Sequence, residues 1–329
     1  MLGTWLSTAR RAARTASALC LAVLAESPER PDAMAKTGAE PVTVADYGSQ
    51  AVILEAVAAD FPRHRVVAEE GAEHFRQAAG PAAAEQVVRL VGAALGRPVR
   101  LDDVLGWIGH PGGDEEPVWA IDPIDGTKGF LRRDQFAVAV GLVAGGRAVG
   151  GVLGCPNLPV DAADPGGRRG VLFWGGEGIG AFAEPLEGGA PVPVSVASTS
   201  GADRVRVLGS VESAHGDPAL VRSVMEAAGI GGGMVRIDSQ VKYGAVASGL
   251  AEVYLRPRNR PEYRERIWDH AAGTAIVTAA GGRVTDLDGL DLDFSLGSRL
   301  EANRGVLATN GRVHGLVLDA LRAVETETG

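Results

Sequence analysis

Residues 118–130, with the sequence VWAIDPIDGTKGF, constrain the fold of this chain more than any other stretch. The apolar run at 118–121 predicts a short buried strand. We expect this strand to break at Pro123 into a polar turn, because proline fixes its own φ and biases Asp122 towards an extended conformation. Asp122 and Asp125 would then be held together on one rigid corner at the end of a buried strand.

The same stretch combines donors for a metal ion with groups that can hold an anion. Two carboxylates and a free carbonyl, such as that of Ile124, are the oxygen ligands that Mg²⁺ prefers. Gly126 would let a phosphate approach the main chain, and the N–H groups of residues 126–129 would open a helix or tight turn that faces an anion. Thr127 could orient a water beside the positive charge of Lys128. Asp-Pro or Asp-Gly alone would indicate an ordinary turn, but the whole string favours a catalytic site.

The composition fits a globular enzyme of one large or two fused domains. The chain has 329 residues, of which 46% are hydrophobic and 22% charged. A net charge of −9 argues against a basic nucleic-acid-binding surface, so a phosphorylated substrate would need local cations, which metal ions can supply. No apolar run has the length of a membrane span. We therefore expect neither a nucleic acid nor a membrane as partner.

Cysteine usage and the N-terminus bear on the cellular compartment. Cys20 and Cys155 offer no disulfide framework and no zinc spacing, which favours a reducing cytoplasm. Residues 1–20 contain Arg, Ser and Thr without acidic residues, which faintly resembles a transit peptide. Their apolar spacing equally suits a first helix over 6–24, and we favour the helix.

Acidic residues also occur at three other predicted element ends, and taken alone each has an ordinary explanation. Asp46 could be the N-cap of the helix predicted over 51–59. Glu69 and Glu70 end a predicted strand and could form a solvated acidic pair. Asp269 precedes an Ala-rich helix and could cap it. Spacing alone leaves these alternatives open.

A family resemblance connects these segments. The string DPIDGT at 122–127 resembles the metal-binding signature of the inositol monophosphatase and fructose bisphosphatase superfamily. Residues 122–138 are most similar to one branch, the 3′(2′),5′-bisphosphate nucleotidases. The strings PVTVADYGSQ, VESAH, DSQVKY and WDHAAG extend the resemblance from about residue 41 to near the C-terminus, and leave 71–117 largely outside it. In that outlying stretch we expect His74 and His110 to be surface residues.

The resemblance implies a layered α/β/α/β/α sandwich, an α+β fold of two tightly packed subdomains. We place their boundary at a Gly-rich seam, so that residues 1–186 carry most metal ligands and residues 187–329 carry the nucleotide-binding residues and the last metal ligand. From spacing alone, Asp238 or Ser239 would simply cap a helix, and a lone histidine such as His215 is more often structural than functional.

The resemblance also assigns roles to individual residues. Two or three Mg²⁺ ions would be held by Glu69, Asp122, Ile124, Asp125 and Asp269. The attacking water would be oriented and deprotonated by Glu69, aided by Glu70, together with Asp46 and Thr127. The nucleotide would be contacted by Gly126, Thr127, His215, Ser239, Lys242 and Arg256.

The implied enzyme is a Mg²⁺-dependent phosphomonoesterase. It would remove the 3′-phosphate of adenosine 3′,5′-bisphosphate, giving AMP, and also act on 3′-phosphoadenosine 5′-phosphosulfate, which links it to sulfur assimilation. A metal-activated water would attack in line, and inhibition by Li⁺ is a family expectation. No activated Ser or Cys occurs in the constellation, so we expect no covalent intermediate. One alternative is a phosphatase of the superfamily acting on inositol phosphates or other sugar phosphates; the other is a non-catalytic nucleotide sensor. The oligomeric state stays open.

Overall fold

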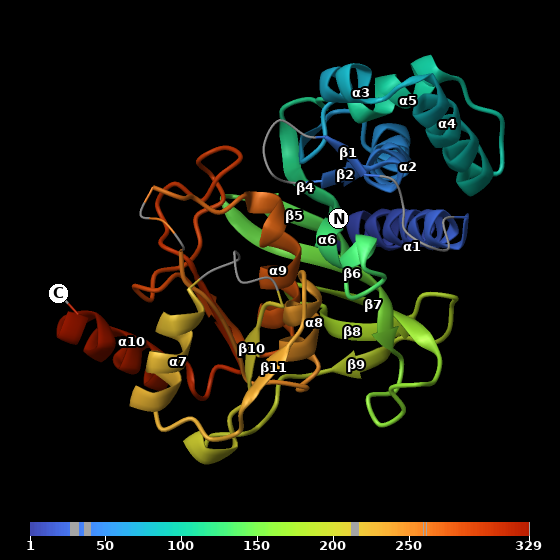
Figure 1. Ribbon diagram of the computed structural model, residues 1–329. Helices are drawn as coiled ribbons and strands as arrows, with labels where there is room; N and C mark the ends of the chain where they lie inside the picture. Colours follow the sequence, from blue (N-terminus) through green and yellow to red (C-terminus); the bar gives the residue numbers. More distant parts are fainter. Residues whose placement is uncertain (27–32, 36–40, 212–216, 259, 261, 329) are drawn as a thin grey trace.

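The computed structural model describes residues 1–26, 33–35, 41–211, 217–258, 260 and 262–328, and shows them arranged in layers (Figure 1). The larger sheet has seven strands whose order in space follows their order in the chain; the first two strands are parallel and all other neighbours are antiparallel. Its strands are β3 (His64–Ala68), β4 (Glu115–Asp125), β5 (Ala137–Ala144), β6 (Arg147–Pro159), β7 (Arg169–Gly176), β8 (Gly180–Pro185) and β9 (Val192–Val194).

The smaller sheet has five strands in the order β11-β10-β12-β14-β13. Strand β10 is parallel to both of its neighbours, whereas β14 is antiparallel to both of its own. The strands are β10 (Val207–Gly209), β11 (Met234–Arg236), β12 (Val253–Arg256), β13 (Arg283–Thr285) and β14 (Val306–Thr309). A two-stranded antiparallel ribbon is formed by β1 (Ala33–Ala35) and β2 (Pro41–Thr43).

Helices fill the layers outside and between the two sheets. Helices α1 (Leu2–Glu26) and α2 (Val44–Asp60) pack on one face of the larger sheet. Helices α8 (Val241–Ala247) and α9 (Ala271–Ala279) lie between the sheets and share a core with both. Helices α7 (Pro218–Ala227) and α10 (His314–Thr328) cover the outer face of the smaller sheet. The predicted five-layer sandwich is confirmed; the subdomain boundary at 186/187 stays a prediction.

The stretch outside the family resemblance forms a helical group at one end of the molecule (Figure 1). It contains α3 (Ala72–Ala78), α4 (Pro81–Leu95) and α5 (Leu101–Ile108), of which α4 and α5 pack against α2. The remaining short helices are α6 (Thr127–Leu131), η1 (Ala202–Arg204) and η2 (Ile267–Asp269).

Helix α9 approaches the larger sheet closely because glycines face it. A Cβ atom at Gly141 would lie 2.6 Å from the Cβ of Ala271, and one at Gly151 would lie 2.3 Å from the carbonyl oxygen of Ala272. These distances are too short for real side chains, so the two glycines allow the helix to rest on the strands. Since Asp269 comes just before α9, this contact fixes how near Asp269 lies to the sheet.

The expected break of the central strand at Pro123 is wrong. Strand β4 continues to Asp125, with Asp122 opposite Ala139 and Asp125 opposite Ala137 on β5. Three residues on β4 therefore advance the register as far as two on β5, which is a β-bulge. A bulge accommodates the missing N–H of Pro123, and it re-aims the side chains that follow.

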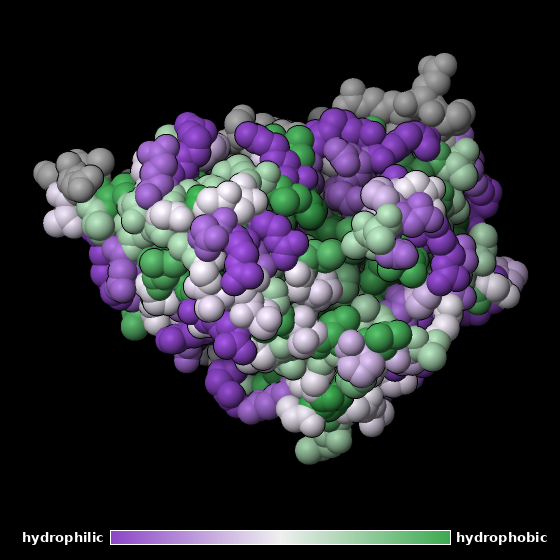
Figure 2. All heavy atoms as spheres, turned by 90° about the horizontal axis from the view of Figure 1, so that it is seen from below, coloured by the Kyte–Doolittle hydropathy of each residue, from purple (hydrophilic) through white to green (hydrophobic). Residues whose placement is uncertain are grey.

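The N-terminal segment is helical, as we expected. Arg10 and Arg14 of α1 form ion pairs of 2.8 and 3.1 Å with Glu184 on β8, which attach the helix to the sheet. Cys20 and Cys155 are buried free thiols. Within the part of the chain that the structure describes, no helix is both long and apolar enough to cross a membrane. The face shown in Figure 2 intersperses hydrophilic and hydrophobic residues.

Candidate active site

The end of β4 presents two carboxylates that main-chain donors hold in place. Oδ1 of Asp122 accepts a hydrogen bond of 3.1 Å from the N–H of Ile124, across the bulge. Oδ2 of Asp125 accepts one of 2.5 Å from the N–H of Gln240, which is 115 residues further along the chain. One carboxylate is thus fixed locally, and the other is fixed by the segment that leads into α8.

Four carboxylates from distant segments act on one another at this point. Glu69 follows β3, and its N–H donates to the carbonyl of Ile121 on β4 at 3.1 Å, which places it beside the bulge. Burial, and then the charges of Glu69, Asp125 and Asp269, raise the pKa of Asp122 well above its usual range. Burial also raises the pKa of Asp269, with Asp125 and Glu69 adding to the effect and Arg256 opposing it. The fold therefore brings the predicted metal ligands within electrostatic reach of one another.

This donor set fits a hard divalent cation. It offers carboxylate oxygens and the carbonyl of Ile124, the ligand types that Mg²⁺ takes in proteins. A cation among these carboxylates would reverse the mutual repulsion that raises their pKa values. The chemistry of the site therefore agrees with the predicted metal, although the ligand roles stay predictions.

Asp46 lies beside this cluster in the first turn of α2. The idea that it could be an N-cap is wrong: the N-cap is Thr43, whose N–H and Oγ1 both donate to Oδ2 of Asp46, at 2.8 and 2.7 Å. The two residues form a capping box. The other carboxylate oxygen, Oδ1, lies 3.4 Å from Oγ1 of Thr127. Burial, and then the charge of Glu70, raise the pKa of Asp46 to about 8.

Glu70 is buried and its main chain is clamped by the side chain of Gln50. The amide of Gln50 accepts from the N–H of Glu70 at 2.9 Å and donates to its carbonyl at 2.6 Å. Nδ1 of His74, on α3, lies 3.8 Å from Oε2 of Glu70 and 2.7 Å from the hydroxyl of Tyr47. His74 and His110, which we expected at the surface, are both half-buried. The helical group outside the resemblance thus reaches the predicted catalytic carboxylate.

Gly126 and Thr127 connect the bulge to the segment before α8. Gly126 has φ +88°, and a Cβ atom there would lie 2.9 Å from the Cβ of Ser239. Oγ1 of Thr127 lies 3.3 Å from the carbonyl of Ile124. Ser239 itself has φ +64°, and its Oγ accepts from the N–H of Val241 at 3.3 Å. A glycine is therefore required where these two chain segments meet.

The expected caps of α8 are also different, since its N-cap is Gln240. The carboxylate of Asp238 instead accepts from Nη2 of Arg132 at 2.6 Å and from the N–H of Val211 at 3.0 Å. Asp238 thereby joins the end of α6 to the first residue of the VESAH string, the predicted nucleotide-contacting segment. His215 lies in that segment, outside the described residues, and its role stays a prediction.

A buried lysine and a half-buried arginine lie beside the carboxylates. Nζ of Lys242 donates to the carbonyl of Ile237 at 3.1 Å and lies 5.1 Å from the ring centroid of Tyr254. Burial lowers the pKa of Lys242 to about 8, although the charge of Asp125 opposes this. Nη2 of Arg256 lies 3.6 Å from Oδ2 of Asp269. Lys242 and Arg256 both lower the otherwise raised pKa of Asp125, so both predicted nucleotide contacts adjoin the predicted metal ligands.

The comparison with known families decides the assignment. The model of the inositol monophosphatase family matches residues 1–326. The chain belongs to the inositol monophosphatase family. Enzymes of this family generally depend on Mg²⁺.

Curated relatives of this inositol monophosphatase family member carry the name that the sequence motifs predicted. A 3′(2′),5′-bisphosphate nucleotidase of Emericella nidulans is 38% identical over 326 residues, covering 88% of this chain and 90% of the relative. One from Oryza sativa is 38% identical over 340 residues, covering 96% of this chain and 93% of the relative. The predicted membership of the nucleotidase branch, and with it the prediction that the chain is a phosphatase, is confirmed.

Solved structures agree on the fold of the family. An inositol monophosphatase from Anabaena (Nostoc) sp. PCC 7120 is 25% identical with a TM-score of 0.66, covering 98% of this chain and 96% of that one. An inositol monophosphatase from Thermotoga maritima is 20% identical with a TM-score of 0.67, covering 99% of this chain and all of that one. The inositol monophosphatase fold that the motifs predicted is therefore confirmed.

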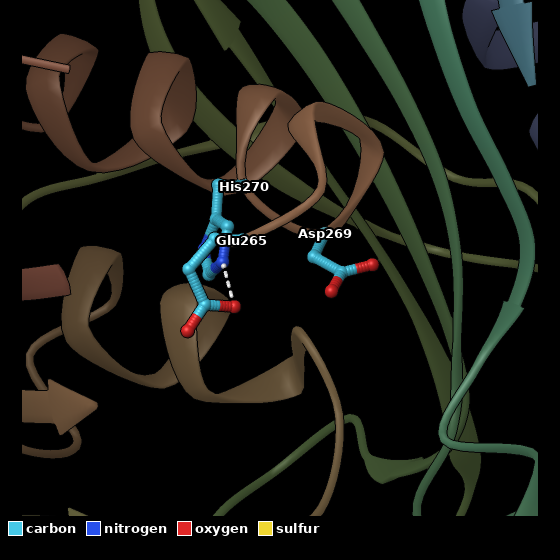
Figure 3. Close-up of side chains that lie close together, drawn as sticks. All are labelled: Glu265, Asp269 and His270. Atoms are coloured by element: carbon cyan, nitrogen blue, oxygen red, sulfur yellow. Dashed lines mark hydrogen bonds and ion pairs between the residues drawn. The ribbon is translucent and has the colours of Figure 1, made fainter. Parts of the chain in front are cut away.

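Sequence reasoning missed Glu265. Its carboxylate, that of Asp269 and the ring of His270 have ligand atoms within 4.8 Å of one another (Figure 3). Oε2 of Glu265 lies 3.1 Å from Nε2 of His270, and the carboxylate of Asp269 stands to one side of this pair. Burial would raise the pKa of Glu265, but Arg256 and His270 lower it to about 2. The charge of this carboxylate is thus balanced by neighbouring side chains. The sequence signal that could have indicated Glu265 was its position, four residues before the predicted metal ligand Asp269.

Proposed function

We propose that the enzyme removes the 3′-phosphate of adenosine 3′,5′-bisphosphate, giving AMP, and does the same with 3′-phosphoadenosine 5′-phosphosulfate. The observation that carries the proposal is the meeting of carboxylates from the end of β3, from β4 and from η2 beside Lys242 and Arg256, in a chain whose relatives are named for this nucleotide class. Its substrate would be a small phosphorylated nucleotide, and its compartment the cytoplasm.

Mg²⁺ would be held by Glu69, Asp122, Asp125, Asp269 and the carbonyl of Ile124, with two or three ions in the site. When bound, the metal supplies positive charge to the phosphate oxygens and the leaving oxygen, and it lowers the pKa of water. The hydrogen bonds from the N–H groups of Ile124 and Gln240 hold two of these carboxylates in place before any ligand arrives.

Asp46, Glu70 and Thr127 would orient the attacking water, and a carboxylate among them would accept its proton. Oδ2 of Asp46 is occupied by the two donors of Thr43, so Oδ1 is the oxygen directed at Thr127. The Thr127 hydroxyl has one proton and lies within reach of two acceptors, Oδ1 of Asp46 and the carbonyl of Ile124. Whichever of these acceptors the hydroxyl donates its hydrogen bond to, the hydroxyl oxygen can still accept a hydrogen bond from a water. No enzyme nucleophile is needed in this arrangement.

Gly126, Ser239, Lys242 and Arg256 would bind the nucleotide through its phosphates. Lys242 and Arg256 bring positive charge to a chain whose net charge is −9. Gly126 leaves the main chain open beside Ser239, where a side chain would collide. Thr127 would contribute its hydroxyl to the same phosphate.

The decisive experiment measures Mg²⁺-dependent phosphate release from adenosine 3′,5′-bisphosphate and from inositol 1-phosphate. Wild type is compared with Asp125→Asn, and with Asp60→Asn as a control that removes a carboxylate at the other end of α2. Asp60 accepts from Thr8 and Arg11, so this variant tests loss of a paired carboxylate without touching the site.

We expect release from the nucleotide in wild type and Asp60→Asn, and its loss in Asp125→Asn. Preference for inositol 1-phosphate would keep the metal chemistry and overturn the nucleotide contacts. Tight nucleotide binding without release of phosphate from either ester would favour the non-catalytic sensor.

A further inference from the structure

The guanidinium of Arg256, at the end of β12, binds a buried carboxylate along one edge. Its Nε donates to Oε1 of Glu265 at 3.2 Å, and its Nη2 lies 2.9 Å from Oε2. The side chain of Glu265 is 3% exposed and that of Arg256 is 18% exposed. Two parallel contacts fix the plane of a guanidinium, which one contact cannot do. The same Nη2 lies 3.6 Å from Oδ2 of Asp269, so the pairing with Glu265 also sets the distance between Arg256 and Asp269.

Glu265 is itself held from its other side. Nε2 of the buried His270 lies 3.1 Å from Oε2 of Glu265, and Nδ1 of His270 lies 2.7 Å from the hydroxyl of Tyr243. Tyr243 follows Lys242 directly in the chain, and His270 follows Asp269. The network therefore ties Arg256 to the two elements that carry a predicted nucleotide contact and a predicted metal ligand.

We infer that Glu265 is a positioning residue for catalysis, which holds the guanidinium of Arg256 in the orientation that serves both Asp269 and the phosphate of the bound nucleotide. This inference rests on the proposed function. Glu265 touches neither the substrate nor the metal in this role; it acts through Arg256. Residues that orient a ligand in this way commonly change activity by about 10–100-fold when they are replaced.

The smaller sheet contains a matched pair that separates positioning from plain stability. Glu252 is 1% exposed, and its carboxylate binds Nη2 and Nε of Arg206 at 2.8 and 3.2 Å. It stands just before the start of β12, whereas Arg256 stands at the end of that strand. Glu252→Gln therefore removes a buried glutamate from the same kind of arginine pair, away from the predicted site.

The test measures kcat and KM for adenosine 3′,5′-bisphosphate with Mg²⁺, and urea unfolding, for Glu265→Gln, Glu252→Gln, Arg256→Gln and the double variant Glu265→Gln/Arg256→Gln. We expect Glu265→Gln to lower kcat/KM by about 10–100-fold. Glu252→Gln should lose comparable stability and keep kcat/KM near the wild-type value. The double variant should be no less active than Arg256→Gln, because Glu265 has nothing to position once Arg256 is gone.

Equal changes of kcat/KM in the two glutamate variants would overturn the inference. The inference would also be overturned if the fold-losses of kcat/KM in the two single variants multiplied in the double variant, because Glu265 would then act independently of Arg256. If Glu265→Gln fails to fold, Glu265→Asp and Glu252→Asp replace the pair: each keeps the charge and shortens the reach, and the inference requires that only the first lowers kcat/KM.

Failure of the proposed function is a separate result. If wild type releases no phosphate from the nucleotide, calorimetric binding of adenosine 3′,5′-bisphosphate to the same four variants takes the place of turnover. Positioning is supported if Glu265→Gln binds the nucleotide more weakly than Glu252→Gln does. It also requires that Glu265→Gln causes no further weakening when Arg256 is already replaced by Gln. Equal affinities refute it.

Discussion

Acid should destabilise this protein through a histidine far from the predicted active site. His314 begins α10 and is 1% exposed. Its Nε2 lies 2.9 Å from Oγ1 of Thr285 and its Nδ1 lies 2.9 Å from Oγ1 of Thr309. Burial, and then the charge of Arg283, lower the pKa of His314 from 6.5 to about 4. The fold therefore holds this imidazole in its neutral form.

The sign and size of the effect follow from the two pKa values. The folded pKa lies below the unfolded one, so the unfolded chain binds the proton more readily between them. The contribution of His314 to stability is complete above pH 6.5 and is lost as the pH falls towards the folded value of about 4. At about 1.4 kcal/mol per pKa unit, the free energy of unfolding should fall by about 3 kcal/mol between pH 7 and pH 4 through this residue.

The assay compares urea unfolding of wild type and His314→Gln across this pH range. Glutamine retains a donor and an acceptor for the two threonines but does not titrate. Carboxylates and the other histidines titrate in both proteins and cancel in the difference. We expect the stability difference to shrink by about 3 kcal/mol on acidification. A difference that stays constant with pH would show that His314 has the same pKa in the folded and unfolded protein, and the reasoning would be wrong.

Three further predictions concern the site and its support. Gly151→Ala should lower the free energy of unfolding by about 1–3 kcal/mol, because its Cβ would lie 2.3 Å from the carbonyl of Ala272, and chemical denaturation measures this. Gly126→Ala should reduce phosphate release strongly and the free energy of unfolding only modestly. The reason is that an added Cβ at φ +88° would meet Ser239 directly beside the bulge that carries the predicted ligands; unchanged turnover would contradict this. Chelation by EDTA should abolish phosphate release without altering the circular dichroism, and added Mg²⁺ should restore it; turnover that survives chelation would exclude the metal cluster.

The sequence motifs predicted much of the site because its ligands stand in short strings with distinctive residue types. Asp122 and Asp125 were found in this way, and the layered fold followed from the resemblance. The continuation of β4 through Pro123 was not foreseeable, since it depends on the register with β5. Local spacing also allowed Asp46 to be an N-cap, although Thr43 three residues earlier could have indicated the capping box.

Residues whose roles depend on how the elements pack together were missed. His74 lies only four residues after Glu70, but its contact with Tyr47 joins α3 to α2 across 27 residues of chain, and no local pattern encodes that second contact. Glu265 gains its importance from Arg256, which approaches it across the loop that follows β12. A charged residue in a loop usually lies in solvent, and only the packed structure shows that this one does not.

The hydrogen bond from the N–H of Gln240 to Asp125 also bears on how the protein is made. The ribosome delivers Asp125 some 115 residues before its partner, and Asp269 emerges later still. Chains tend to fold from the N-terminus as they are synthesised, so the larger sheet can form while its acidic edge still lacks α8, η2 and α9. That edge then carries crowded carboxylates without their main-chain donor and without the neighbouring cations. The candidate site can therefore be completed only after the larger sheet, because it needs segments that are synthesised later.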